Sequence, residues 1–188
     1  MKTIQSTTTN FLLLLETHPS AKKRLLDEIL PAIEKVKDNI IEGFDYETVM
    51  DFDYIGKCMY EILRLDPPVP MTILASMMQD VKIKNINFGP NTPFWINTRA
   101  IHYDPKQWKE PSKFVPERFD SQSDWFKRPD GGQRNPLTFS PFLGGRRICI
   151  GKTFAEVTIR FTIPILLHHL QYEFLNKDQL INKPSFNI

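Results

Sequence analysis

A single cysteine between glycines carries the clearest chemical signal in the sequence. Cys149 lies in the stretch Phe142–Gly151, and the apolar periodicity that follows it predicts a helix. The free N–H groups and the dipole at a helix N-terminus favour the thiolate form of a cysteine. Gly145 can adopt the positive φ of a tight turn, and Gly151 lets a flat ligand approach the backbone. Arg147 can donate charge-assisted hydrogen bonds to a carboxylate. This combination suits a thiolate that ligates a metal inside a large planar cofactor.

The spacing of these residues resembles that of a known family. Phe142, Gly145, Arg147, Cys149 and Gly151 match the motif Phe-x-x-Gly-x-Arg-x-Cys-x-Gly of the cytochrome P-450 haem-thiolate monooxygenases. The resemblance implies that Cys149 is the axial ligand of the iron in haem b (iron protoporphyrin IX). It also implies that Phe142, Gly145 and Gly151 shape the haem pocket and that Arg147 binds a haem propionate. The alternative is a buried free cysteine beside a glycine-rich turn.

A second group of charged residues lies in a predicted helix and in a later loop. Glu61 and Arg64 are separated by one helical turn, which by itself predicts an exposed ion pair worth about 0.2–0.5 kcal/mol. The order of Glu-x-x-Arg, Pro67–Pro70 and Pro116–Phe119 is, however, similar to that of the same family. The resemblance implies that Glu61, Arg64 and Arg118 form a buried structural charge network behind the haem loop.

One threonine corresponds to a catalytic position of the family. Measured back from His18-Pro19, Thr3 aligns with the threonine of the long central helix that crosses the haem and protonates bound oxygen. The resemblance therefore implies a proton-relay role for Thr3, although Lys2 stands where the family usually has an acidic residue. The alternative for Thr3 is a helix cap or a packing residue.

The segment after the Glu-x-x-Arg helix corresponds to part of the family's substrate pocket. The resemblance implies that Val69, Met71 and Thr72 pass over the haem and contact the substrate. Leu74 departs from the family pattern, which often has Arg or His here to hold a propionate. The same comparison favours a structural, hydrogen-bonding role for His102.

Hydrophobic periodicity and the positions of the prolines predict the helices and strands that must position these residues. Helices are expected over Thr3–Thr17, from Pro19 with a bend or an end at Pro31, over Asp53–Leu65, and from Ile150 with a kink at Pro164. The last helix is expected to bury Phe154, Val157 and Phe161. The charged segment Lys35–Glu47 is expected to be a solvated connection.

Most of the chain's 15 prolines lie between Pro67 and Pro141, which excludes a long helix there. Short apolar or alternating runs predict a small sheet formed by Met71–Ala75, Val81–Ile83 and Phe94–Asn97, with a further strand at Tyr172–Phe174. The predicted fold class is therefore mainly α with a small β-sheet (α+β). The resemblance identifies it as the C-terminal part of the cytochrome P-450 fold.

Composition limits the remaining possibilities. With 41% hydrophobic and 24% charged residues, the chain of 188 residues is globular, and its net charge of +2 does not indicate nucleic-acid binding. Cys58 and Cys149 are the only cysteines, which predicts neither a disulfide framework nor a zinc site, and Cys58 is expected to be a core thiol. The sequence shows no signal peptide or membrane span, since the run Phe11–Leu15 is far too short.

The resemblance covers essentially the whole chain but only part of the family's domain, so residues 1–188 are expected to form one incomplete domain. It implies a haem-thiolate monooxygenase that inserts one oxygen atom of O₂ into a small organic substrate. Electrons would come from a flavoprotein reductase, a redox partner that docks on basic residues near the cysteine. Arg146 and Lys152 lie near the cysteine, and Lys127, Arg128 and Arg134 lie in the polar loop Asp124–Pro136. The alternative is that all five charges are simply solvated.

These 188 residues alone are expected to be inactive, with Phe11–Leu15 left exposed by absent helices. The alternative function is a truncated, non-catalytic haem-binding or structural remnant. No membrane anchor is expected in this chain, although the resemblance is compatible with an endoplasmic reticulum location for a full-length parent.

Overall fold

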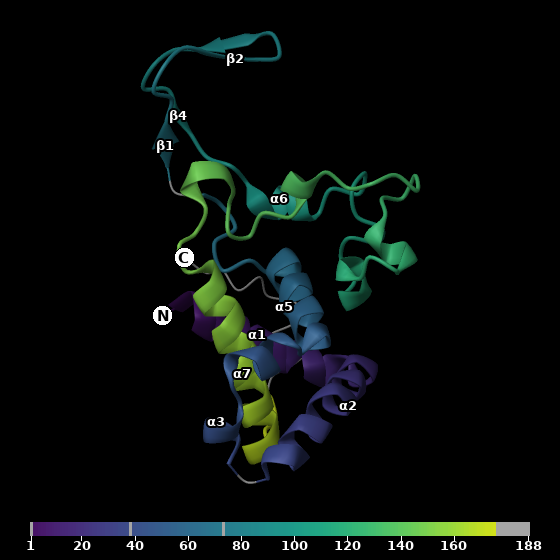
Figure 1. The fold of residues 1–188 in the computed structure, drawn as a ribbon. Helices are drawn as coiled ribbons and strands as arrows, with labels where there is room; N and C mark the ends of the chain where they lie inside the picture. The colour runs from purple at the N-terminus through teal and green to yellow at the C-terminus, as the bar shows by residue number, and fades with distance from the viewer. Residues whose placement is uncertain (1, 38, 73, 176–188) are drawn as a thin grey trace.

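Four helices enclose the main hydrophobic core in the computed structural model, which describes residues 2–37, 39–72 and 74–175. They are α1 (Lys2–Thr17), α2 (Pro19–Val36), α5 (Asp53–Leu65) and α7 (Lys152–His169), with α1, α5 and α7 in mutual contact (Figure 1). Each of the four contributes fully buried side chains to the core, among them Phe11, Leu25, Ile55 and Ile163. Each buried aliphatic side chain of this kind stabilises the fold by about 1.5–3 kcal/mol. The expectation that Phe11–Leu15 would be exposed is wrong, because α5 and α7 cover Phe11, Leu13 and Leu15.

The helix boundaries correct several expectations. Helix α2 continues through Pro31 to Val36, so the expected end at Pro31 is wrong. Helix α7 continues through Pro164 to His169, which agrees with the expectation that this proline does not end its helix. A proline removes only one N–H, and the buried Ile33 and Ile163 beside these prolines keep both helices packed against the core. The segment Lys35–Glu47 is not simply a solvated connection.

The short helices α3 (Ile40–Gly43) and α4 (Tyr46–Met50) lie in and just after this segment. Ile40 and Phe44 of this segment are buried in the hydrophobic core. The charged residues around them had suggested that the whole segment was solvated. On α7, by contrast, Phe154 is exposed and Val157 and Phe161 are only half-buried. The expected burial of Phe154 is therefore wrong, because its side of α7 has no described element packed against it.

Two charged side chains, the half-buried Glu28 and the buried Arg160, hold the start of α5 in place. Glu28 of α2 accepts hydrogen bonds from the backbone N–H groups of Tyr54 (2.7 Å) and Ile55 (3.1 Å), which satisfies two of the free donors at the helix N-terminus. Arg160 of α7 donates to the carbonyl oxygens of Met50 and Phe52 at 2.8 and 2.7 Å. Gly56 makes this possible, because a Cβ there would lie 2.1 Å from Arg160 Nη2. These contacts fix α5 against α2 and α7.

The β structure is smaller than the sequence predicts and is divided into two antiparallel pairs. β1 (Ala75–Ser76) pairs with β4 (Pro93–Phe94), and β2 (Val81–Ile83) pairs with β3 (Ile86–Phe88) in a hairpin that projects away from the helices (Figure 1). The strand at Val81–Ile83 is confirmed, β3 was missed, and Met71 makes only an isolated bridge to Asn97. Tyr172–Phe174 is not a strand; instead the Tyr172 hydroxyl donates to the Leu12 carbonyl at 3.3 Å.

From Pro67 to Pro141 the described chain contains no long helix, as the prolines predict. The ordered pieces there are α6 (Thr98–His102) and the 3-10 turns η1 (Pro116–Phe119), η2 (Asp124–Phe126) and η3 (Pro136–Thr138), followed by η4 (Gly145–Arg147). The fold is thus mainly α with small antiparallel β pairs. Among the helices that the structure describes, none has the length and apolar character that crossing a bilayer requires.

Candidate functional site

A cavity that is partly open to solvent lies where three helices meet the cysteine loop. Its lining comprises Thr3, Ile4 and Thr7 of α1, Met59 and Leu63 of α5, Pro68 and Val69, Pro141, Phe142 and Cys149 of the loop, and Ala155 and Ile159 of α7. The wall is mostly apolar, with the Cys149 thiol and the α1 threonines as its polar side chains. A concave apolar wall with few polar groups is the usual form of a small-molecule or cofactor site.

The cysteine loop closes on itself before α7 begins. Leu143 (φ 63°) and Gly145 (φ 61°) both adopt left-handed conformations, and these reverse the chain. The Cys149 N–H then donates to the Phe142 carbonyl at 2.9 Å, which brings two of the predicted site residues together. Cys149 is exposed, so the alternative of a buried free cysteine is wrong. The buried thiol is Cys58, and burial raises its pKa strongly, as expected of an inert core residue.

The structure explains a glycine at one of the two motif positions by backbone conformation and at the other by the space that it leaves. The positive φ predicted for Gly145 is confirmed, and an alanine there would strain the backbone although no atom lies within 4 Å of its Cβ. At Gly151 φ is ordinary, and an added Cβ would meet Cys149 Sγ at 3.7 Å, a normal van der Waals contact. The described chain therefore does not require glycine at 151. The space that it leaves lies beside the cysteine sulfur.

Behind the loop, one buried carboxylate binds two buried arginines. Glu61 accepts from Arg64 Nε at 2.7 Å and Nη2 at 2.8 Å, from Arg118 Nε at 3.0 Å and from the Val115 N–H at 2.9 Å. The side chains of Glu61, Arg64 and Arg118 are 0% exposed. Arg64 also donates to the carbonyl oxygens of His102 (2.9 Å) and Pro111 (2.7 Å). The structure thus joins the three residues predicted as a network and connects α5 to the loop ahead of η1.

A third arginine belongs to the same region, and the sequence analysis did not place it there. Arg134 donates to the carbonyl of Arg118 and to that of Trp125 (3.2 Å), and its guanidinium lies 4.2 Å from the ring centroid of Trp108. Burial, and then the positive charge of Arg118, lower the pKa of Arg134 to about 10. Arg134 was expected on a partner-docking or solvated face. Its backbone contacts give it a structural role instead, and only the folded loop could reveal this.

His102 connects the charge network to the segment that leads to the cysteine. It is 0% exposed; the Ser140 N–H donates to its Nε2 at 3.1 Å, and its Nδ1 lies 3.2 Å from the Arg64 carbonyl. Because Nε2 accepts, Nδ1 carries the proton, and a neutral ring satisfies both contacts. Burial is the main cause that lowers the pKa of His102 to about 4. The predicted hydrogen-bonding role is therefore confirmed.

This buried histidine should make stability depend on pH. An unfolded histidine titrates near pH 6.5, so between about pH 6.5 and 4 the unfolded chain binds a proton that the folded chain rejects. Stability is complete above pH 6.5 and falls as the pH drops to 4, by about 3 kcal/mol from this residue alone. In urea unfolding from pH 7 to 4, the wild type should lose that much more stability than His102→Gln, which does not titrate. Parallel pH profiles for the two proteins would contradict this.

Some of the other predicted site residues line the cavity and some do not. Thr3 lies on the cavity wall, and its carbonyl accepts from the Thr7 hydroxyl at 2.9 Å. Val69 also lines the cavity, whereas Met71 and Thr72 do not; Thr72 instead bonds the backbone of Ile96. Gly145, Arg147 and Gly151 lie in or next to the loop without lining the cavity, and Leu74 is 53% exposed.

Several lining residues were not identified from the sequence. Met59 and Leu63 on α5, and Ala155 and Ile159 on α7, are pairs four residues apart that share a helix face. That spacing was visible, but an apolar stripe predicts burial against protein and against a cofactor equally well. Only the packing of α5 and α7 around one cavity shows that these residues line it.

Comparison with known proteins agrees with this geometry. The family model described as cytochrome P450 matches residues 1–187. Cytochrome P450 71B38 of Arabidopsis thaliana is 37% identical over 86% of this chain and 30% of its own length. Cytochrome P450 3A31 of Mesocricetus auratus is 31% identical over 97% of this chain and 34% of its own length.

A solved structure shares the fold. The retinoic acid-bound cyanobacterial CYP120A1 superimposes with a TM-score of 0.73 and 28% identity, over 89% of this chain and 35% of that chain. The chain thus spans about a third of the length of the curated relatives it matches. The family model matches nearly all residues of the chain, and the cysteine of the motif is exposed at the wall of a mostly apolar cavity. The chain therefore belongs to the cytochrome P450 family.

Proposed function

We propose that this chain supplies the thiolate side of a haem-thiolate monooxygenase, with Cys149 as the axial ligand of haem b. The observation that carries the proposal is the position of Cys149, whose exposed thiol lines a mostly apolar cavity between α1, α5 and α7. Membership of the cytochrome P450 family supports the same chemistry. Bound haem would supply the activation of O₂, and a thiolate ligand favours O–O cleavage.

The residues around the cavity fit such a group. The walls are mostly apolar, which is the usual character of a site that holds a large apolar cofactor. The absence of a side chain at Gly151 leaves room beside the sulfur, where a flat ring must approach closely. Phe142 contributes an aromatic side to the same wall, and the turn at Gly145 sets its direction.

The remaining roles follow from the chemistry of the side chains. Arg147 is exposed in η4 and would bind a propionate, which is a carboxylate that suits its planar guanidinium. The hydroxyl of Thr3, on the α1 wall, would hold a proton for transfer toward the reacting oxygen. Val69 would contact a small organic substrate from its position on the same wall, with Met71 and Thr72 in the segment that follows.

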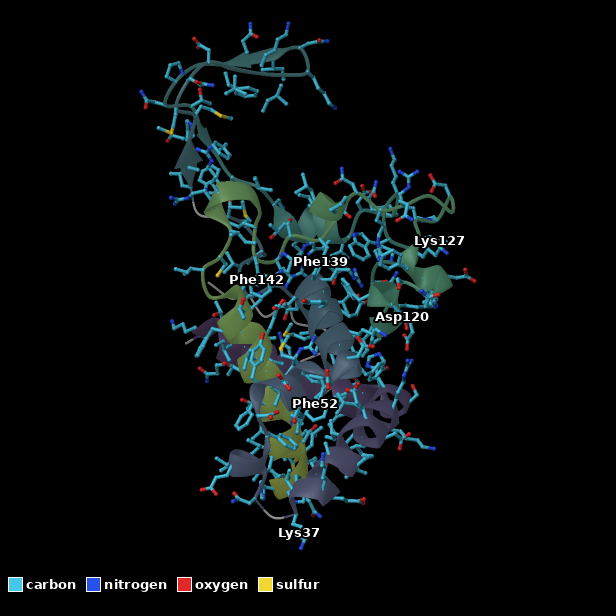
Figure 2. The ribbon with its side chains drawn as sticks, in the orientation of Figure 1. Lys37, Phe52, Asp120, Lys127, Phe139 and Phe142 are labelled. Atoms are coloured by element: carbon cyan, nitrogen blue, oxygen red, sulfur yellow. The ribbon has the colours of Figure 1, made fainter. Side chains whose placement is uncertain are left out.

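A flavoprotein reductase is the proposed electron donor. Arg146 in the cysteine loop is exposed and Lys152 at the start of α7 is half-exposed, which would suit an acidic partner surface near Cys149. Lys127 is exposed on the loop after η2, away from the labelled Phe142 (Figure 2). Arg134 is no longer part of this proposal because its guanidinium is engaged by backbone carbonyls.

A non-catalytic haem-binding or structural role is the second candidate, and the open side of the cavity favours it. Ile148, Ile150 and Phe154 lie near Cys149 yet are 51%, 103% and 69% exposed, so these residues do not seal a haem from water. Water that reaches a haem quenches reactive oxygen chemistry.

Expression of the 188 residues, with haem titration followed by turnover assays with reductase and NADPH, tests both candidates. We expect substoichiometric haem and no turnover from these residues alone, with haem still held through Cys149. Full haem loading with substrate oxidation would contradict the second candidate. A chain that binds no haem at all would overturn the proposed function.

A further inference from the structure

One hydrogen bond joins two of the helices that line the cavity. The Tyr60 hydroxyl on α5 donates to Glu156 Oε1 on α7 at 2.7 Å. Tyr60 follows Met59 and Glu156 follows Ala155, and both of these neighbours line the cavity. Glu156 is buried, at 9% exposure, and its other charged neighbour is Lys152 at 3.9 Å. The contact therefore ties the second turn of α7 to α5 directly beside the cavity wall.

The ring of the same tyrosine reaches the segment on the other side of the cysteine. Tyr60 packs against Phe139 and against Phe119, in both cases with ring centroids 5.5 Å apart. Phe139 precedes Phe142 by one turn of chain, and the Phe142 carbonyl accepts from the Cys149 N–H (Figure 2). Tyr60 thus contacts both flanks of the cysteine loop, through its ring before Cys149 and through its hydroxyl after it.

The direction of the hydrogen bond is well defined. Burial, and then the hydrogen bond to the Glu156 carboxylate, raise the pKa of Tyr60, so the phenol remains protonated at neutral pH. A phenol that donates to a buried carboxylate forms a charge-assisted hydrogen bond, which is stronger than a neutral one. Neither residue belongs to the cysteine motif, and neither lines the cavity itself.

We propose that Tyr60 and Glu156 are positioning residues that hold Cys149 in the cavity wall. That this positioning serves the ligation of haem iron rests on the proposed function. The Tyr60–Glu156 hydrogen bond itself is independent of that proposal. Loss of the Tyr60 hydroxyl should release the start of α7 and the cysteine loop without disrupting the charge network at Glu61. The effect should be local, since the aromatic contacts of the ring remain in a phenylalanine variant.

Amide hydrogen exchange on the 188-residue chain without haem tests this directly. In Tyr60→Phe, the Cys149 amide should exchange about tenfold faster, which corresponds to the loss of one charge-assisted hydrogen bond. The Ile62 and Arg64 amides in the last turn of α5 should be unchanged. Tyr103→Phe is the matched control, because its hydroxyl donates to the Leu65 carbonyl at 2.9 Å, away from the loop, and Cys149 exchange should then match the wild type.

Substitutions at the acceptor complete the test. Glu156→Ala should accelerate Cys149 exchange as Tyr60→Phe does, and the double variant should show little more, since both remove one contact. Glu156→Gln, which keeps an acceptor, should restore much of the protection. Unchanged Cys149 exchange in Tyr60→Phe, or equal acceleration at Ile62, would overturn the inference. A wild-type chain that binds no haem would overturn the proposed function and leave this exchange result intact.

Discussion

Replacing Arg64 with alanine should lower the free energy of unfolding by about 3–5 kcal/mol, the loss expected when one member of a buried ion pair is removed. Glu61 is fully buried and would lose two of its four donors, Arg64 Nε and Nη2. The carbonyl oxygens of His102 and Pro111 would also lose their donors inside the protein. Unpaired buried polar groups are expensive because no water replaces the lost contact.

A surface pair in the same chain is a matched control for this prediction. Lys113 and Glu110 have the same i,i+3 spacing as Arg64 and Glu61, but their side chains are 64% and 50% exposed. Lys113→Ala should therefore change stability by less than about 1 kcal/mol. The two variants are compared by denaturant unfolding of the full chain. Similar small shifts of the midpoint for both would show that burial of the Glu61 pair carries no special stability.

Cys149→Ser should abolish the red-shifted absorption band of the reduced, CO-bound protein, because a serine oxygen does not reproduce a thiolate ligand. The measurement requires the haem-loaded chain, and its readout is the CO-difference spectrum. The expected loss is complete, since the loop presents one sulfur to the cavity.

The second cysteine supplies the control for that spectrum. Cys58 is fully buried in the core, so Cys58→Ala should reduce stability by creating a small void but should keep the thiolate band. If the band survives in Cys149→Ser, the ligand assignment is wrong. If both variants lose it, general loss of folding rather than loss of the ligand is the cause, and thermal unfolding of each variant separates these cases.

Helical periodicity predicted the buried apolar face of α5 but not the burial of its charged residues. Ile55, Cys58, Met59 and Ile62 predicted one buried face of α5, and all four are buried. Glu61 and Arg64 were assigned to a buried network only through resemblance to a family, because the same spacing on an isolated helix describes a surface pair. Their burial depends on a loop about fifty residues later in the chain, from which Val115 and Arg118 reach Glu61.

Proline and charge were less reliable guides. Pro31 was expected to bend or end its helix, yet α2 continues to Val36, because packing of Ile33 outweighs the loss of one backbone hydrogen bond. Lys35–Glu47 looked solvated, yet Ile40 and Phe44 turn into the core. The run at Tyr172–Phe174 had the residues of a strand but has no pairing partner among the described segments. A strand requires a neighbour, and sequence pattern cannot supply one.

The sequence by itself predicted the chemistry of the site: a cysteine after a turn that needs a left-handed glycine, before a helix, with a spacing that resembles the cytochrome P450 motif. These features are local, so a few adjacent residues specify them. Tertiary structure alone decided which apolar faces line the cavity, that Arg134 supports the charge network, and that Tyr60 reaches Glu156. The cavity and the Tyr60–Glu156 contact arise only when α1, α5 and α7 pack around a common space, and the Arg134 contacts arise only when the loop from Trp108 to Arg134 folds on itself.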